Sequence, residues 1–146
     1  MTRYLLDTNI ISSATKPRPS QPLMEWMAKQ VDDDLFISSL SLAEIGRGIL
    51  EKPAGKKRRE LEEWFKGPEG PQALFRGRVM AFDEQAALIW ARLMSQGTHA
   101  GHPRSAFDMV VAAIAETNDF TVVTDNEKNF PGVKLLNPLR TVRSQP

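Results

Sequence analysis

The first nine residues place the strongest constraint on how this chain can fold. Residues 4–6, Tyr-Leu-Leu, form an apolar run without polar alternation, and Asp7, Thr8 and Asn9 follow at once. Such a run predicts a strand covered on both faces, as in a parallel sheet packed between helices. Ligands of these sheets bind beyond the carboxyl ends of the strands, which is where Asp7 would lie. The alternative is that Asp7 only caps the next helix, because Asp, Thr and Asn all favour caps.

Charge and cysteine content exclude several classes of site. Nineteen basic and 18 acidic side chains give a net charge of +1, so any face that binds nucleic acid has to be local. The absence of cysteine excludes disulfides, thiolate metal sites and cysteine nucleophiles. The longest apolar run, residues 109–115, is too short to cross a membrane, and the start of the chain has no signal-peptide pattern. We therefore expect a cytoplasmic protein without a membrane segment.

Strand and helix patterns alternate along the rest of the chain. Further strands are predicted at residues 35–37, 79–82, 120–124 and 133–136. Helices are predicted at residues 9–14, from 22, in 41–50, at 56–66, 84–95 and from 105 to near 117–119. This alternation predicts an α/β fold, a three-layer α/β/α domain with a mostly parallel central sheet. The domain would span residues 1–140, followed by a short flexible tail at 141–146.

Three polar clusters have ordinary structural explanations. The basic tetrad at residues 56–59 could contact phosphate, although a solvated helix face with internal ion pairs is the favoured interpretation. His99 and His102 fall in a predicted break at residues 96–104 and are interpreted as loop histidines rather than metal ligands. The acidic run at residues 32–34 is interpreted as a solvated turn.

Four acids occupy comparable places in this pattern. Asp7 and Asp125 directly follow strands, and Glu44 and Asp108 lie in the first turns of helices. These places share one edge of a parallel sheet, where crowded carboxylates raise one another's pKa values. A divalent cation relieves that repulsion, and hard oxygen ligands select Mg²⁺ or Mn²⁺. Such a site can activate water for phosphoryl displacement. Each acid also has a capping alternative; Ser41 with Glu44 and Ser105 with Asp108 both match capping boxes.

Four stretches together resemble the PIN-domain ribonucleases, the toxins of VapC-type toxin–antitoxin pairs. They are residues 5–9, 39–45, 107–115 and 123–130, with 136–138 trailing. Their order and spacing extend from residue 5 to 138. The resemblance implies that Asp7, Glu44 and Asp108 are the metal-binding acids. It also implies that Thr8, Asn9 and Thr124 support them.

The fourth acidic position departs from the family pattern. Asn126 and Asn129 stand where relatives tend to have carboxylates or, at the first position, an amide, and the acid here is Asp125. Either Asp125 completes the catalytic set or Asn126 binds metal through its amide oxygen. With one negative charge fewer, we expect one firmly held ion and a second that requires substrate phosphate.

The resemblance further implies hydrolysis of an RNA phosphodiester. Asp7 and Asp108 would hold the metal, Glu44 would position or deprotonate the attacking water, and Arg47 and Arg104 would bind phosphate. Relatives form homodimers and are inhibited by a cognate antitoxin. The candidate apolar contacts for that antitoxin are Trp26, Trp64 and Phe65.

Three other interpretations remain open at this point. A haloacid-dehalogenase-type phosphatase would need an acid two residues after Asp7, where the chain has Asn9. A receiver-like or scaffold domain would use the acids only as caps. A catalytically weakened PIN protein would bind RNA or antitoxin without cleaving.

Overall fold

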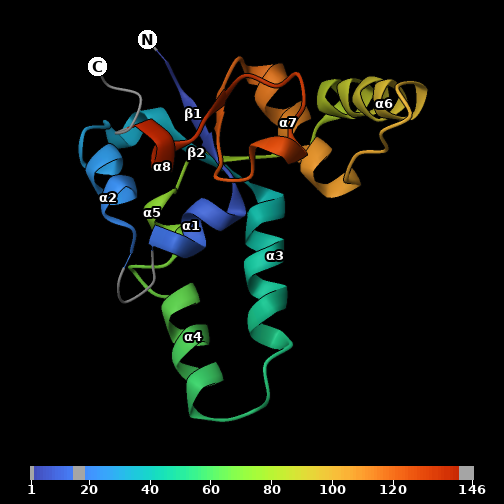
Figure 1. Ribbon diagram of the computed structural model, residues 1–146. Helices are drawn as coiled ribbons and strands as arrows, with labels where there is room; N and C mark the ends of the chain where they lie inside the picture. The colour runs from blue at the N-terminus through green and yellow to red at the C-terminus, as the bar shows by residue number, and fades with distance from the viewer. Residues whose placement is uncertain (1, 15–18, 142–146) are drawn as a thin grey trace.

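A five-stranded parallel sheet forms the centre of the molecule, in the order β3-β2-β1-β4-β5 (Figure 1). The computed structural model describes residues 2–14 and 19–141. The strands are β1 (Tyr4–Leu6), β2 (Leu35–Ser38), β3 (Val79–Met80), β4 (Thr121–Val123) and β5 (Leu135–Leu136). Every strand pairing among these residues is parallel, which confirms the predicted sheet. Because β1 and β4 are central neighbours, their carboxyl ends meet in the middle of one sheet edge.

Helices and short 3-10 turns connect the strands. The α-helices are α1 (Thr8–Ala14), α2 (Gln21–Ala28), α3 (Ser39–Leu50), α4 (Lys56–Lys66), α5 (Pro71–Leu74), α6 (Glu84–His99), α7 (Ala106–Asn118) and α8 (Pro138–Thr141). The 3-10 turns are η1 (Asp32–Asp34), which contains the acidic run, and η2 (Glu127–Asn129). The predicted tail begins at Thr141, which is still the last residue of α8, and its residues 142–146 lie outside the described chain. No helix in the described ranges is long and apolar enough to cross a membrane.

Successive residues of β1 face two separate cores. Leu5 is fully buried with α6 and α7 on one face of the sheet. Leu6 is buried on the other face with α1, α2 and α5. This arrangement confirms the three-layer α/β/α architecture, and it explains why the strand is apolar without alternation. Trp26 belongs to the second core, where its ring lies 5.1 Å from that of Tyr4 in an edge-on contact. Trp26 is therefore not available as a surface contact for a partner.

Several predicted boundaries were wrong at the ends of elements. The strands expected at residues 79–82, 120–124 and 133–136 are shorter, and Phe82 is 38% exposed. Helix α6 continues through the predicted break to His99, so His99 is helical and only His102 lies in a loop. Gly97 is buried within this part of the helix, and the Cγ atom of Arg104 lies 2.8 Å from the position that a Cβ on Gly97 would take. A glycine that signals a break in sequence here permits close packing.

The capping box predicted at Ser41 is also wrong. Helix α3 begins at Ser39, and Ser38 is its N-cap, accepting a hydrogen bond from the Ser41 N–H at 3.1 Å. Ser41 is instead fully buried. The sequence could not separate the two serines, because each stands before the same apolar helix pattern.

Helices α3 and α4 form a hairpin that extends away from the sheet (Figure 1). Phe65 packs between them, 3.5 Å from the position of a Cβ on Gly46, so Phe65 is held inside the hairpin. The chain then turns tightly at Gly70. A Cβ on Gly70 would lie 2.3 Å from the carbonyl oxygen of Trp64 and 2.4 Å from that of Phe65. This approach of backbone to backbone requires a residue without a side chain.

Two glycine substitutions should therefore have opposite effects on stability. Gly70→Ala should lower the free energy of unfolding by about 2 kcal/mol or more, because neither carbonyl can move without disturbing the end of α4. Gly48→Ala should raise it by about 0.5–1 kcal/mol, since Gly48 is helical with nothing within 4 Å of its would-be Cβ. Urea denaturation measures both. Equal effects of the two substitutions would contradict this account of the turn.

Candidate active site

Asp7 lies at the carboxyl end of the central strand β1 and is only 6% exposed. Its Oδ1 accepts a hydrogen bond from the Thr8 N–H at 2.9 Å, and its Oδ2 accepts one from the buried Thr124 hydroxyl at 3.0 Å. The backbone carbonyl of Asp7 also accepts from the N–H groups of Ile10 and Ile11. Asp7 therefore caps α1, as the structural alternative predicted, and its carboxylate is also fixed across the sheet by Thr124 at the end of β4.

A chain of hydroxyl groups leads to Glu44. The Thr8 hydroxyl contacts the Glu44 carboxylate and lies 2.9 Å from the Ser41 hydroxyl. A hydroxyl carries one proton and an ionised carboxylate only accepts, so Thr8 donates to Glu44 and accepts from Ser41. Ser41 in turn lies 3.4 Å from the Ser38 hydroxyl. The ends of β1 and β2 are thereby connected to the side chain of Glu44 in α3.

Asp108 enters the site from the first turn of α7. Ser105 is the N-cap of this helix and accepts from the Asp108 N–H at 3.2 Å, as predicted. The side chains of Ser105 and Asn129 hydrogen-bond the Asp108 carboxyl group. Asn129 belongs to η2, which follows β4, so a fourth segment of the chain reaches the acids.

The three carboxyl groups titrate above their ordinary range. Burial raises the pKa of Asp7 from its ordinary 3.8 to about 6, opposed by the hydrogen bonds from Thr124 and Thr8 and assisted by the negative charges of Asp108 and Glu44. Burial also raises the pKa of Glu44, to which the charge of Asp108 adds. Burial raises the pKa of Asp108 against its hydrogen bonds. The negative charge of Asp108 acts on both Asp7 and Glu44, and that of Glu44 acts on Asp7, so these acids lie within electrostatic reach of one another, as the sequence pattern predicted.

The fourth position differs from these three. Asp125 is exposed, and it is not among the charges that act on Asp7, Glu44 or Asp108. Asn126 is half-buried, and its N–H donates to the Thr124 hydroxyl at 3.0 Å. Asn9 is exposed. The side chain that reaches Asp108 from this loop belongs to Asn129.

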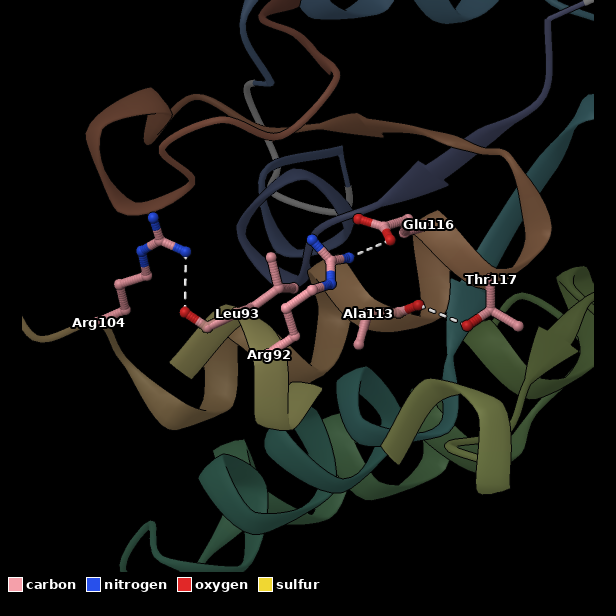
Figure 2. A network of polar contacts seen from close by, with 6 residues as sticks. All are labelled: Arg92, Leu93, Arg104, Ala113, Glu116 and Thr117. Atoms are coloured by element: carbon pink, nitrogen blue, oxygen red, sulfur yellow. Dashed lines mark hydrogen bonds and ion pairs between the residues drawn. The ribbon is translucent and has the colours of Figure 1, made fainter. Parts of the chain in front are cut away.

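The two arginines proposed to bind phosphate are both engaged elsewhere. Arg47 pairs with Glu51 at 2.8 Å, and its side chain is 77% exposed. Arg104 crosses Gly97 and donates from Nη1 to the carbonyl oxygen of Leu93 at 2.9 Å (Figure 2). Arg92 and Glu116 form an ion pair that joins α6 to α7 in the same view. Among the described residues, neither Arg47 nor Arg104 forms a hydrogen bond or an ion pair with the three acids.

The spacing of the acids limits how a metal ion could bind. In the described ranges, no group of three or more Asp, Glu or His side chains is arranged to hold one ion together. Mg²⁺ commonly takes only one or two carboxylates and fills its remaining positions with water and substrate phosphate. The donor set of Asp7, Glu44 and Asp108, all oxygen ligands with raised pKa values, fits that mode of binding.

Three residues that organise the acids were not among the predicted site residues. Ser38 and Ser41 belong to the hydroxyl chain, and Asn129 supports Asp108. Ser41 carried a signal, but it was interpreted as a cap. Asn129 was indicated only by its position in the family pattern, because nothing in the sequence spacing connects it with Asp108.

The buried charge of Asp7 should make stability depend on pH. The folded-state pKa lies above the unfolded one, so the folded protein binds more protons between pH 4 and 6 and its stability falls as pH rises through that window. In EDTA at pH 8, Asp7→Asn should raise the free energy of unfolding by about 2 kcal/mol. The gain should shrink towards pH 4.

Denaturant titrations at several pH values measure this effect. Asp125→Asn removes an exposed acid near the same edge and serves as the control, with an expected change within about 0.5 kcal/mol at every pH. A gain for Asp7→Asn that is the same at pH 4 and pH 8 would show that burial of its charge is not the cause.

Comparison with known proteins places this arrangement in a family. A family model described as PIN domain matches residues 4–134. The chain is 33% identical over 136 residues to toxin FitB of Neisseria gonorrhoeae, covering 92% of this chain and 96% of FitB. It is 32% identical over 136 residues to VapC ribonuclease Y4jK of Sinorhizobium fredii, with the same shares covered, 92% and 96%. It is 25% identical over 138 residues to the tRNA(fMet)-specific endonuclease VapC of Salmonella typhimurium, covering 92% and 97%.

The same relationship holds for solved structures. The fold matches the crystal structure of FitAcB from Neisseria gonorrhoeae with a TM-score of 0.85 and 32% identity, covering 93% of this chain and 98% of that one. The match therefore includes the sheet, the helices around it and the edge where the acids lie. The chain belongs to the PIN-domain family, within the group that contains the VapC-type toxins.

Proposed function

We propose that this protein is a divalent-metal-dependent endoribonuclease and the toxin of a toxin–antitoxin pair. The observation that carries the proposal is the convergence of Asp7, Glu44 and Asp108, with raised pKa values, at one edge of the sheet. The names of the relatives, which include a VapC ribonuclease and a tRNA(fMet)-specific endonuclease, support RNA as the substrate.

The protein's own groups divide the work between them. Asp7 and Asp108 would hold Mg²⁺ or Mn²⁺, one ion firmly and a second with the help of substrate phosphate. When bound, the metal supplies Lewis-acid stabilisation of the phosphate and a water of lowered pKa. Glu44 would position that water and accept its proton, because its raised pKa is closer to neutral pH than that of a free glutamate. Thr8 orients the Glu44 carboxylate, and Thr124 orients that of Asp7.

The other predicted site residues contribute less directly to this proposal. Asn126 and Asn129 would complete the site as neutral amides beside Thr124 and Asp108. Asp125 was expected to be catalytic and stays a candidate only through a rearrangement of its exposed side chain. Arg47 and Arg104 would contact phosphate only with the nitrogen atoms that their present partners leave unused.

Cleavage of RNA by the purified, antitoxin-free chain tests the proposal. A tRNA(fMet) transcript and other structured RNAs are incubated with Mg²⁺ or Mn²⁺, and with EDTA. Asp7→Asn should reduce the cleavage rate by about 100-fold or more, because loss of even an outer partner of a metal ligand costs 10–100-fold. Asp125→Asn is the matched control and should retain most of the activity.

The weakened-enzyme alternative has its own observation and outcome. Asn126 and Asn129 supply no charge at the fourth position, and Asp125 is exposed and is not among the charges that raise the pKa of Asp7. If the wild-type chain binds RNA and metal without cleaving, and Asn126→Asp creates cleavage, the chain is a degenerate PIN protein. If the wild-type chain neither bound nor cleaved RNA, both functions would be contradicted, and the acids would serve only as helix caps.

An apolar groove on the far side of the sheet from α6 and α7 offers a place for the antitoxin. The groove has a volume of about 280 Å³ and is lined by Ile11, Met24, Met27, Trp64, Leu74 and Phe75. Two acids, Asp32 and Glu69, also line it, together with Arg78, which donates to the carbonyl oxygens of Asp32 and Leu35. Leu74 is 52% exposed and Met24 is 39% exposed, which is unfavourable for apolar side chains without a partner. An antitoxin segment with apolar residues and flanking basic residues would match this surface.

A pair of leucine substitutions tests that assignment. Leu74→Gln should weaken inhibition by the cognate antitoxin by about tenfold or more, since burial of a leucine contributes about 1.5–3 kcal/mol. Leu88→Gln changes a leucine that is 69% exposed on α6, outside the groove, and should leave inhibition unchanged. Both variants should cleave RNA like the wild type when the antitoxin is absent. Equal inhibition of both variants would place the antitoxin elsewhere. The homodimer implied by the family resemblance stays a prediction.

A further inference from the structure

The turn between α3 and α4, together with the first turn of α4, carries a larger net positive charge than the whole chain. We call residues 51–59 the hairpin tip. It contains five basic side chains and one acid, a net charge of +4, whereas the whole chain has +1. Its basic residues are Lys52, Lys56, Lys57, Arg58 and Arg59. The hairpin extends from the sheet, so this charge is held away from the rest of the domain (Figure 1).

Internal ion pairing accounts for only one of these cations. Arg58 pairs with Glu62 at 2.9 Å and donates to the carbonyl oxygen of Lys52. Within the described part of the chain, no ion pair involves Lys56, Lys57 or Arg59. The predicted solvated helix face is confirmed by the exposed side chains of Lys56, Lys57 and Arg59, and the predicted internal ion pairing is confirmed for Arg58.

Local stability does not explain the cluster. The four cations occupy the first turn of α4, which has no acid, and Gly55 caps the helix without a side-chain hydrogen bond. Positive charge at this end of a helix opposes the helix dipole. The two lysines also line an open hollow of about 400 Å³ together with Glu60 and Leu61. A charged surface that lowers the stability of its own helix requires another explanation, and an external polyanion provides one.

Helix α3 connects this surface to the acids. Glu44 lies near the start of α3, and Leu50 ends the helix about 9 Å further along its axis. Arg47 lies between them on the exposed surface, paired with Glu51 of the hairpin tip. A polyanion that reaches Glu44 can therefore continue along α3 to the hairpin tip without crossing the domain.

We propose that the hairpin tip is a second contact site for the RNA substrate, which binds its phosphates away from the scissile bond through Lys56, Lys57 and Arg59. This inference rests on the proposed ribonuclease function and adds to it an extended, folded RNA as the preferred substrate. The site recognises backbone charge, so it contributes affinity and orientation more than base sequence.

Two triple variants with the same total charge test this proposal. Lys56→Gln, Lys57→Gln and Arg59→Gln are combined in one chain, and Lys29→Gln, Lys66→Gln and Arg76→Gln in the control. The control residues are exposed and lie outside the hairpin tip. Binding of a tRNA transcript is measured in EDTA, so that no cleavage occurs, at several salt concentrations. Initial cleavage rates with Mg²⁺ or Mn²⁺ are then measured for the same chains.

The hairpin-tip variant should bind RNA about tenfold more weakly than the control. The slope of its log Kd against the logarithm of the salt concentration should be smaller by about two. Its loss of cleavage should appear as a raised KM. Its melting temperature should not fall, because cations are removed from the positive end of α4. Folding failure therefore cannot imitate the expected result.

Three outcomes would overturn the proposal, and they differ from one another. Cleavage by the wild type with equal RNA binding by the two triple variants would remove the hairpin-tip site and leave the ribonuclease function intact. Absence of both RNA binding and cleavage in the wild type would remove both. If the hairpin-tip variant lost inhibition by the antitoxin while keeping RNA affinity, the cluster would be a protein contact instead.

Discussion

The hydrogen bond from the Thr124 hydroxyl to the Asp7 carboxylate holds the centre of this molecule together. It joins the ends of the two central strands in a fully enclosed position, with an oxygen–oxygen distance of 3.0 Å. Without it, Asp7 would be a buried acid with only one hydrogen bond from the Thr8 backbone to oppose the cost of burial. The strand order β2-β1-β4 makes this bond possible, because it places Asp7 between Ser38 and Thr124.

The polar groups at this edge of the sheet have hydrogen-bond partners, although the clustered carboxylates remain electrostatically unfavourable. Every buried side-chain nitrogen and oxygen in the described ranges has a hydrogen-bond partner. The three carboxyl groups nevertheless titrate above their ordinary range, because hydrogen bonds offset burial and mutual repulsion only in part. Proteins tolerate such unfavourable charge where function requires it, and the surrounding apolar cores compensate for the loss of stability.

Helix α3 unites the features that matter for function. Its N-cap, Ser38, terminates β2, and its first turns carry Ser41 and Glu44 into the site. Its far end leads to the hairpin tip, and its packing against α4 through Gly46 and Phe65 fixes the direction of that arm. The apolar groove proposed for the antitoxin lies by the other end of the hairpin, where Trp64 contributes to its wall. One rigid element therefore relates the acids to two surfaces with different chemistry.

The layered α/β fold and a cluster of acids at one edge of its sheet could both be predicted from the sequence. Buried strands such as residues 4–6 must be apolar on both faces, and that pattern is visible without coordinates. Asp7, Glu44, Asp108 and Asp125 were expected together because the ends of parallel strands and the starts of the next helices share one edge. The family resemblance singled out the first three, and Asp125 is exposed. Local chemistry also predicted the Ser105 cap correctly.

Which of several neighbouring residues caps a helix, contacts the acids or enters the core became clear only from the three-dimensional packing. Ser38 rather than Ser41 caps α3, Asn129 rather than Asp125 reaches the acids, and Trp26 lies in the core while Trp64 faces a groove. Gly97 lies inside a helix, and Arg104 packs over it from the next loop. These choices depend on contacts between segments distant in sequence, which residue type and spacing do not encode. A serine, an asparagine or a glycine fits several local roles equally well, so packing against distant segments is needed to select one of them.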